Sequence, residues 1–141
     1  MTRLPAHLHI AFDELGIAEL PGASDNPRIL EYLETCESLP EELRGHDETA
    51  WCSAFVNWVV ETAGGTGTNS AWARSWLGWG EASTELELGL VAVFSRGEGG
   101  HVGWVVGWSD QYIKVLGGNQ GNEVSIAYYP RARLLGLRRA A

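Results

Sequence analysis

The stretch TAWCSAFVNW, residues 49–58, places a cysteine at the start of an apolar helical pattern. The apolar side chains recur at the spacing of one helix face, at Cys52, Phe55, Val56, Val59 and Ala63. The opposite row is polar, with Ser53, Asn57 and Glu61. Thr49 can act as the N-cap of this helix, and the glycines at 64 and 65 can end it. Cys52 then lies in the first turn, where it could be a core residue, half of a disulfide, a metal ligand or a nucleophile.

Length and charge narrow the class of protein. The chain has 141 residues, so we expect one domain, 1–141, that buries a core without metal or disulfide staples, and we expect a monomer. Its net charge is −8, from 18 acidic and 10 basic residues, which argues against nucleic acid as a partner. No apolar run approaches the roughly 18 residues of a membrane-spanning helix, and the first residues do not resemble a signal peptide. Cys36 and Cys52 are therefore expected to be free thiols.

The periodicity changes near residue 90, from helical to alternating. A short helix is expected within residues 4–20, and another over 26–36 with Asn26 as N-cap and Pro27 at the first helical position. Residues 70–80 predict a further short helix whose tryptophans belong mainly to the core. Five β-type runs follow, over residues 90–96, 101–108, 111–116, 123–129 and 133–139. This order predicts an α+β fold with the helices packed on one face of a roughly five-stranded antiparallel sheet.

The second and third β-type runs predict a hairpin with a three-residue loop over 109–111. This register pairs His101 with Asn119, Gly103 with Gly117, Val105 with Val115 and Gly107 with Ile113, all on one face. Glycine in a strand commonly marks the close approach of another backbone. We therefore expect the start of the cysteine helix to lie over these glycines, with its apolar row on the aliphatic residues of the same face.

Cys52, His101 and Asn119 would then meet as nucleophile, base and orienting group. A helix N-terminus and an imidazole both lower the pKa of a thiol, and the backbone N–H of Cys52 could bind an oxyanion. Each residue also has a simpler interpretation, as a core cysteine, a strand-start histidine and a turn asparagine. Two other functions stay open: a zinc site using Cys52 and His101 with His46 or Asp47, and a non-catalytic binding module with a tryptophan-rich surface.

Three longer blocks of sequence point to a family. They are DETAWCSAFVNWVV (47–60), GLVAVFSRGEGGHVGWVVGW (89–108) and YIKVLGGNQGNEVSIAYYPRARLLGLRR (112–139). Together they resemble the CHAP and NlpC-type peptidoglycan hydrolases of the papain-like superfamily, over roughly residues 45–139. Residues 1–44 fall outside the resemblance and are expected to form a variable N-terminal helical segment.

The resemblance implies a papain-like fold and an amidase or endopeptidase that cuts the peptide stem of peptidoglycan without a metal or other cofactor. It carries the nucleophile onto Cys52, the base onto His101 and the orienting position onto Asn119, with Gln120 in reserve. Many relatives have a glutamate two residues before that asparagine, where this chain has Gly117. The residues expected to contact the substrate are Asp47, Trp51, Trp76 and Gln120.

The resemblance also implies where such an enzyme acts. A chain made in the cytoplasm without a signal peptide must reach the periplasm or cell wall by export, delivery or lysis. A phage endolysin and a secreted antibacterial effector both satisfy this requirement. The effector would have a secretion machine and an immunity protein as partners.

Overall fold

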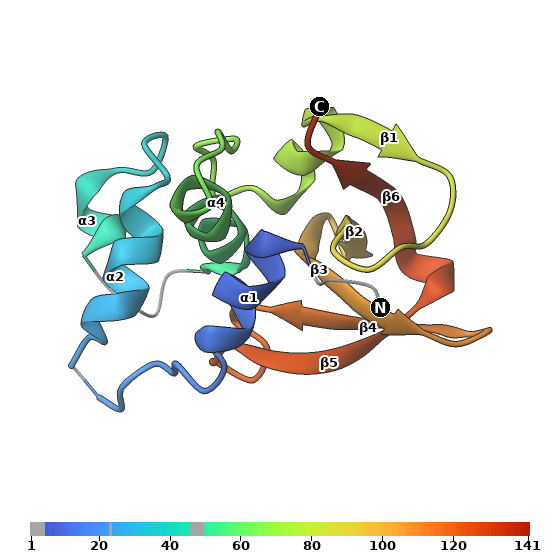
Figure 1. The fold of residues 1–141 in the computed structure, drawn as a ribbon. Helices are drawn as coiled ribbons and strands as arrows, with labels where there is room; N and C mark the ends of the chain where they lie inside the picture. Colours follow the sequence, from blue (N-terminus) through green and yellow to red (C-terminus); the bar gives the residue numbers. More distant parts are fainter. Residues whose placement is uncertain (1–4, 23, 46–49) are drawn as a thin grey trace.

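The computed structural model describes residues 5–22, 24–45 and 50–141, and it has helices on one side of the molecule and a sheet on the other (Figure 1). The helices are α1 (Ala6–Asp13), α2 (Pro27–Glu34), α3 (Glu41–Arg44), α4 (Cys52–Thr62) and the 3₁₀ turns η1 (Ala73–Gly78) and η2 (Arg131–Arg133). The strands are β1 (Glu81–Ser83), β2 (Val91–Arg96), β3 (Gly99–Trp108), β4 (Tyr112–Gly117), β5 (Ser125–Pro130) and β6 (Leu134–Arg139). In the described residues, no helix is long and apolar enough to span a bilayer.

The α+β class and the antiparallel sheet are confirmed, with one strand more than expected. The sheet has six strands in the order β1-β6-β2-β3-β4-β5. The additional strand, β1, spans only Glu81–Ser83 and pairs with the outer edge of β6. Its short, largely exposed sequence has no alternating apolar pattern, which is why the sequence did not predict it.

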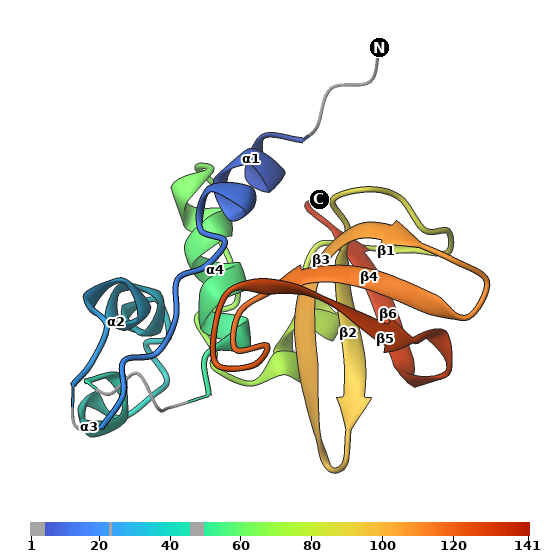
Figure 2. The same cartoon turned by 90° about the horizontal axis from the view of Figure 1, so that it is seen from below.

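Helix α4 is the central helix, lying between α2 and the sheet (Figure 2). It begins at Cys52 with Trp51 at the N-cap position, whereas the predicted cap, Thr49, lies outside the described residues. The cap of α2 is confirmed, because the Asn26 side chain accepts a hydrogen bond from the backbone N–H of Arg28 at 2.9 Å. Helix α4 therefore contacts the sheet directly, through β3 and β4.

The two faces of the sheet bury two separate apolar clusters. Helix α4 packs on the face that carries Val102, Trp104 and Leu116. The other face carries Val105 and Val115, together with Phe94 and Tyr129. The prediction that α4 would cover Val105 and Val115 is therefore wrong. Both faces of β3 are apolar, so the alternating pattern could not indicate which one takes the helix.

The register of the β3–β4 hairpin is as predicted only away from its loop. Val105 pairs with Val115, but Gly107 pairs with Lys114 instead of Ile113. The shift lies between Val105 and Gly107, where β3 has one residue more than β4. Because Trp108 pairs with Ile113 and not with Tyr112, the predicted closure of the hairpin by a three-residue loop is wrong, whereas the pairing of Trp104 with Leu116 nearer His101 keeps the predicted register.

Candidate active site

Cys52 is the first residue of α4 and only 8% exposed. Burial raises the pKa of its thiol, while hydrogen bonds from the backbone N–H groups of Val102 and Ser53 act in the opposite direction. Val102 directly follows His101 in β3, so the sulfur lies against the strand segment that carries the histidine. The thiol is consequently protonated in the resting protein and lies next to the start of β3.

His101 is buried in β3, and its ring orientation is set by Gln120. The distance between His101 Nε2 and Gln120 Oε1 is 2.8 Å. The Gln120 amide nitrogen donates to the carbonyl oxygens of Ser125 at 2.7 Å and Val115 at 3.3 Å. Because the amide nitrogen must face these two acceptors, Oε1 faces the imidazole and accepts a hydrogen bond from Nε2–H.

This hydrogen bond leaves Nδ1 of His101 as the unprotonated nitrogen of the ring. In the part of the chain that the structure describes, Nδ1 is buried and has no hydrogen-bond partner, Cys52 included. Burial lowers the pKa of His101 to about 4, against the opposing effect of the Gln120 hydrogen bond. At neutral pH the ring is therefore a neutral imidazole with a free lone pair, which is the form required of a general base.

Gly117 provides the space for the hydrogen bond between His101 and Gln120. A Cβ atom at position 117 would lie 2.5 Å from Gln120 Oε1 and 3.3 Å from His101 Nε2. Asn119 has a positive φ of 57°, and this left-handed residue turns the chain so that Gln120 points back over β4. The expectation that Asn119 lies against His101 is therefore wrong: Gln120, the reserve candidate, occupies that place.

Tyr129 of β5 is a further residue of this cluster that the sequence did not single out. Its ring stacks on His101, with 4.8 Å between centroids and an interplanar angle of 19°. Its hydroxyl group donates to Gln120 Oε1 at 3.2 Å, and Phe94 stacks beside it at 4.9 Å. The alternating pattern of residues 123–129 predicted the strand, but no local signal distinguished Tyr129 from its neighbours.

Gly118 allows the end of β4 to approach the start of α4. A Cβ atom at position 118 would lie 2.7 Å from both the Trp51 ring and the Cβ of Phe55. The predicted role of glycine as a contact point for the helix is thus filled by Gly118, because Gly117 faces Gln120 and Gly103 faces Val115. This contact keeps the cysteine end of α4 against the end of β4, directly before the turn that carries Gln120.

The two tryptophans expected at the substrate groove are fully buried. Trp51 donates its Nε1–H to Glu19 Oε2 at 3.0 Å, and Trp76 donates to the hydroxyl oxygen of Ser53 at 2.8 Å. The burial contradicts the prediction that these side chains contact the substrate. Asp47, also expected there, lies outside the described residues.

Two residues of the polar row of α4, Ser53 and Asn57, are also buried, because they hold the loop that follows the helix, whereas Glu61 is exposed. Ser53 donates to the carbonyl oxygen of Ser70 at 2.6 Å. Asn57 accepts from the backbone N–H of Thr68 at 2.7 Å and donates to the same Ser70 carbonyl at 3.2 Å.

Among the tryptophans of residues 70–80, only Trp72 is well exposed, at 60%. The 3₁₀ helix η1 has three residues per turn, so residues four apart do not lie on one face of it.

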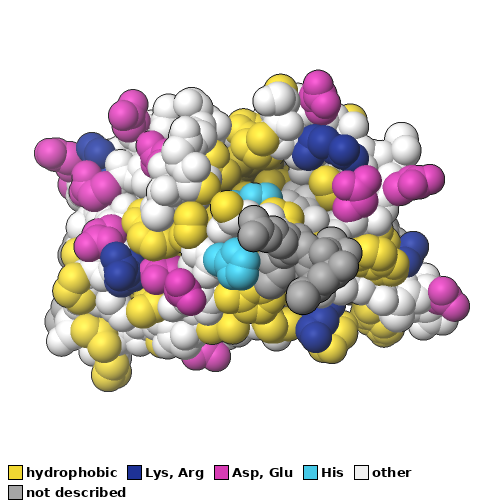
Figure 3. All heavy atoms as spheres, in the orientation of Figure 1, with side chains coloured by type: hydrophobic (Ala, Val, Ile, Leu, Met, Phe, Trp, Pro, Cys, Tyr) yellow, Lys and Arg dark blue, Asp and Glu magenta, His cyan; other side chains and the backbone are white. Residues whose placement is uncertain are grey.

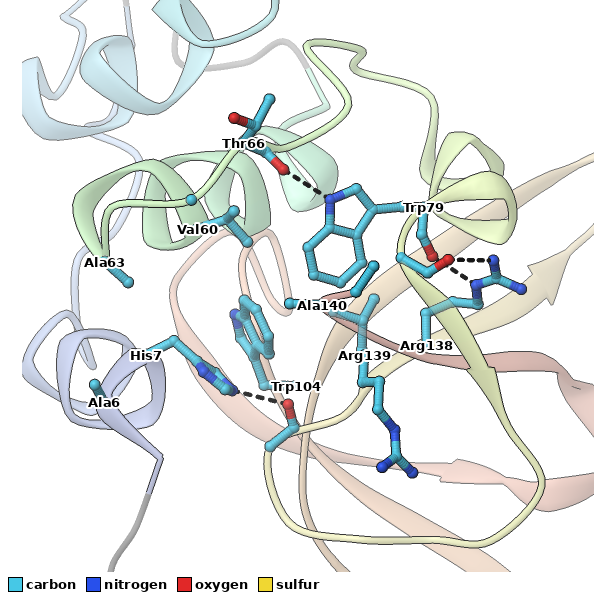
Figure 4. A pocket seen from close by; sticks show the side chains of 15 residues that line it. Ala6, His7, Val60, Ala63, Thr66, Trp79, Trp104, Arg138, Arg139 and Ala140 are labelled. Carbon is cyan, nitrogen blue, oxygen red and sulfur yellow. Dashed lines mark hydrogen bonds between the residues drawn. The ribbon is translucent and has the colours of Figure 1, made fainter.

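A large cavity lies at the opposite end of α4. It has a volume of about 550 Å³ and is lined by Val60, Trp79, Trp104, His7 and Arg139, among others. Figure 4 shows the rings of Trp79 and Trp104 on two sides of this cavity, and Figure 3 shows apolar side chains gathered at a hollow on this face. Neither Cys52 nor His101 lines it.

A metal centre was the alternative use of the cysteine and histidine. Within residues 5–22, 24–45 and 50–141, no three histidine, cysteine, aspartate or glutamate side chains are grouped as ligands. His46 and Asp47, the further ligands considered for zinc, are outside these ranges. The described geometry instead brings together a thiol, an imidazole and a carboxamide, which suits acyl transfer to sulfur.

Comparison with known families confirms the family resemblance. A family model described as the CHAP domain matches residues 44–119, which include Cys52 and His101. The match ends at Asn119, directly before Gln120. No curated protein matches the chain.

Proposed function

Since the chain belongs to the CHAP domain family, a family of peptidoglycan hydrolases, we propose that Cys52 and His101 cut an amide bond in the peptide stem of peptidoglycan. The observation that carries the proposal is the hydrogen bond between His101 and Gln120, which leaves Nδ1 of His101 buried and unprotonated, in the strand whose next residue, Val102, donates its backbone N–H to the Cys52 sulfur. A structural histidine would normally have both ring nitrogens satisfied at this depth. An unpaired basic nitrogen, one residue along β3 from the backbone N–H that contacts the thiol, is available as the base for that thiol.

The first half of the reaction is acyl transfer to sulfur. Nδ1 of His101 takes the proton of the Cys52 thiol as the sulfur attacks the amide carbonyl carbon. The backbone N–H of Cys52, in the first turn of α4, donates to the oxyanion that develops. The imidazolium then protonates the leaving amine, the C–N bond breaks, and a thioester remains on Cys52.

The second half releases the acid product. His101 accepts a proton from a water molecule, which attacks the thioester carbonyl and displaces the Cys52 thiolate. The thiolate recovers its proton from the imidazolium. Through both halves Gln120 accepts a hydrogen bond from Nε2–H, so it holds the ring in one orientation and stabilises its positive charge. Gln120 is a positioning residue, because its contacts are with His101 and not with the thiol.

The test is a comparison of the two cysteines. Cys36 is also free and buried, and burial raises the pKa of its thiol to about 11, but the contact of its sulfur is with the Thr35 hydroxyl oxygen, at 3.9 Å. We expect Cys52→Ala to lower kcat/KM on purified peptidoglycan by about 10³-fold or more, and Cys36→Ala to leave it within about threefold. Circular dichroism checks that both variants fold.

Mass spectrometry of the released muropeptides identifies the bond. New N-termini on alanine indicate an amidase at the muramoyl link, whereas shortened stems indicate an endopeptidase. Retained activity in purified Cys52→Ala protein contradicts the thiol mechanism. Binding of peptidoglycan by the unsubstituted protein without any product favours a non-catalytic binding module instead.

The setting follows from the substrate. A peptidoglycan hydrolase has to reach the wall, so we propose delivery after synthesis, either by phage-mediated lysis or by a contact-dependent secretion machine. The second route requires an immunity protein in the producing cell. Neighbouring genes distinguish the two: phage structural genes support the endolysin, and a gene for a small periplasmic protein that inhibits the enzyme supports the effector.

A further inference from the structure

Tyr129 contacts residues that lie across the sheet from its own strand. Within β5, which the structure describes in full, it is the only buried residue, and its backbone pairs with Ile113 of β4. Its ring, however, stacks on Phe94 of β2 and His101 of β3, with centroid distances of 4.9 Å and 4.8 Å. In the sheet order, β3 and β4 separate β5 from β2. The sheet must therefore curl, as Figure 2 shows, where β5 crosses over β2 and β3.

The Tyr129 ring covers one face of the His101 imidazole, at an interplanar angle of 19°. The hydrogen bond to Gln120 fixes where Nε2 of the imidazole lies, but it leaves the ring free to tilt about that contact. A flat ring packed against the face removes this freedom. Because the lone pair of Nδ1 lies in the plane of the imidazole, the stacked ring sets the direction from which His101 accepts a proton.

The Tyr129 hydroxyl group completes the hydrogen bonding of Gln120. It donates to Oε1 at 3.2 Å, the same atom that accepts a hydrogen bond from Nε2–H of His101. The amide nitrogen of Gln120 donates to the carbonyl oxygens of Val115 and Ser125, so the whole carboxamide is satisfied. Burial raises the pKa of Tyr129, so its hydroxyl group keeps its proton at neutral pH and stays a donor. A buried network in which every group has a partner is rigid.

We propose that Tyr129 is a positioning residue of the proposed reaction: its ring holds the plane of the His101 imidazole, and its hydroxyl group holds the Gln120 oxygen that binds Nε2–H. The inference rests on the proposed function and concerns how its base is kept in place. Tyr129 acts through His101 and Gln120, the two side chains that it contacts. The next residue of the chain, Tyr128, has the same chemistry but is 64% exposed, so it provides a matched control.

Two substitutions separate the ring from the hydroxyl group. Tyr129→Leu removes both, and we expect it to lower kcat on purified peptidoglycan by about 10- to 100-fold with KM nearly constant. Tyr129→Phe keeps the ring, so it is expected to recover most of this loss and to lower kcat by about three- to tenfold, the effect of one neutral hydrogen bond. Tyr128→Leu and Tyr128→Phe are expected to change kcat by about twofold or less.

The imidazole nitrogens of His101 provide a measurement that does not depend on turnover. Their ¹⁵N NMR signals, assigned by their loss in His101→Gln protein, report which nitrogen carries the proton. We expect the tautomer protonated at Nε2 in the unsubstituted protein, in Tyr128→Leu and in Tyr129→Phe. In Tyr129→Leu both nitrogen signals should move toward the average of the two tautomers.

Circular dichroism shows whether each variant folds. Unchanged kcat and unchanged nitrogen signals in folded Tyr129→Leu protein would overturn the positioning role, as would an equal loss of kcat in Tyr128→Leu. If Tyr129→Leu does not fold, Tyr129→Phe decides: a three- to tenfold loss of kcat at constant KM supports the role, and an unchanged kcat overturns it.

The two measurements also separate this inference from the proposed function. Cleavage that depends on Cys52 but not on Tyr129, with unchanged His101 signals in Tyr129→Leu, overturns the positioning role and leaves the hydrolase intact. A change of tautomer in Tyr129→Leu, without any cleavage by the unsubstituted protein, supports the action of Tyr129 on His101 and contradicts the hydrolase.

Discussion

The two ends of helix α4 differ in what they offer a ligand. The N-terminal end has a nearly closed cluster of Cys52, His101 and Gln120, in which polar groups are desolvated and held in fixed orientations. The C-terminal end has a cavity of about 550 Å³ between Trp79 and Trp104, with no cysteine. We therefore place the proposed chemistry at the buried polar contacts and not at the cavity between Trp79 and Trp104.

The charged groups at the second end are already satisfied. Arg138 donates to the carbonyl oxygens of Trp79 at 2.6 Å and Gly80 at 3.1 Å, and Arg139 pairs with Glu87. His7 contacts a backbone oxygen there, that of Gly89, at 2.8 Å from Nε2. By contrast, His101 contacts a side chain that is itself fixed by two further hydrogen bonds. Each end of α4 thus has a histidine. Substituting His7 and His101 one at a time tests whether only the end that carries Cys52 is needed for activity.

The largest expected effect is the loss of activity on removing His101. Because Nδ1 of His101 is the only base assigned to the thiol, we expect His101→Ala to lower kcat/KM by about 10³-fold or more. His7→Ala is the matched substitution at the cavity end and is expected to change kcat/KM by about twofold or less. Steady-state hydrolysis of purified peptidoglycan provides the measurement. Comparable losses in the two variants would show that the two ends of α4 are not functionally distinct.

The buried imidazole also predicts how stability depends on pH. The pKa of His101 is lowered from 6.5 to about 4 in the folded protein, so the unfolded chain binds the proton more tightly. Folding stability is therefore fully present above pH 6.5 and falls as the pH drops toward 4, by about 3 kcal/mol from this group. Urea unfolding at pH 7 and pH 4.5 measures the change.

In His101→Gln protein this part of the pH dependence should be absent. Burial lowers the pKa of His7 too, so this histidine also makes the folded protein less stable as the pH falls. We therefore expect His7→Gln to remove a separate part of the pH dependence of the free energy of unfolding. An unchanged difference between pH 7 and pH 4.5 in His101→Gln protein would mean that its imidazole is not the buried neutral group described above.

A smaller effect is expected for the group that orients His101. Without Gln120, the tautomer with a free Nδ1 loses its hydrogen bond, so we expect Gln120→Ala to lower kcat by about 10- to 100-fold. KM should stay nearly constant and the pH profile should change, because the contact is with the imidazole. Asn119→Gly is the neighbouring control, because glycine keeps the left-handed turn, and it should retain kcat within about threefold. The reverse ranking would return the orienting role to Asn119.

The sequence predicted the elements of this site better than their contacts. The spacing around Cys52 indicated the helix, and the alternation in residues 101–116 indicated the hairpin, because these are local periodicities. Gln120 replaced Asn119 because the strand ends at Gly117 and a left-handed residue then turns the chain. A register argument assumes that the strand continues, and it cannot anticipate this turn.

The burial of Trp51 and Trp76 depended on tertiary structure in the same way. Each indole nitrogen has a partner distant in sequence, Glu19 for Trp51 and Ser53 for Trp76. The choice of sheet face for α4 was equally non-local, since both faces of β3 offer apolar side chains. Tyr129 of β5 reaches His101 of β3 because β5 pairs with β4 at the edge of the sheet, and this strand order is a property of the tertiary structure.

Two buried indoles provide the smallest test of the contrast between the ends of α4. At the N-terminal end Trp51 Nε1 donates to a carboxylate oxygen of Glu19 at 3.0 Å. At the cavity end Trp104 Nε1 is buried and has no partner within the described residues. Substitution by phenylalanine removes a similar ring volume from each site, so the difference between the variants reflects mainly the indole N–H.

We expect Trp51→Phe to lower the free energy of unfolding by about 1–2 kcal/mol more than Trp104→Phe, because only Trp51 loses a hydrogen bond to a charged group. The loss of an unsatisfied N–H also offsets part of the packing lost in Trp104→Phe, whose indole lies 4.5 Å from the His7 ring. Urea unfolding at neutral pH measures both values. A larger loss of unfolding free energy in Trp104→Phe would mean that the Trp104 N–H has a hydrogen-bond partner in solution. The buried polar groups at the cavity end of α4 would then be as well satisfied as those at the end that carries Cys52.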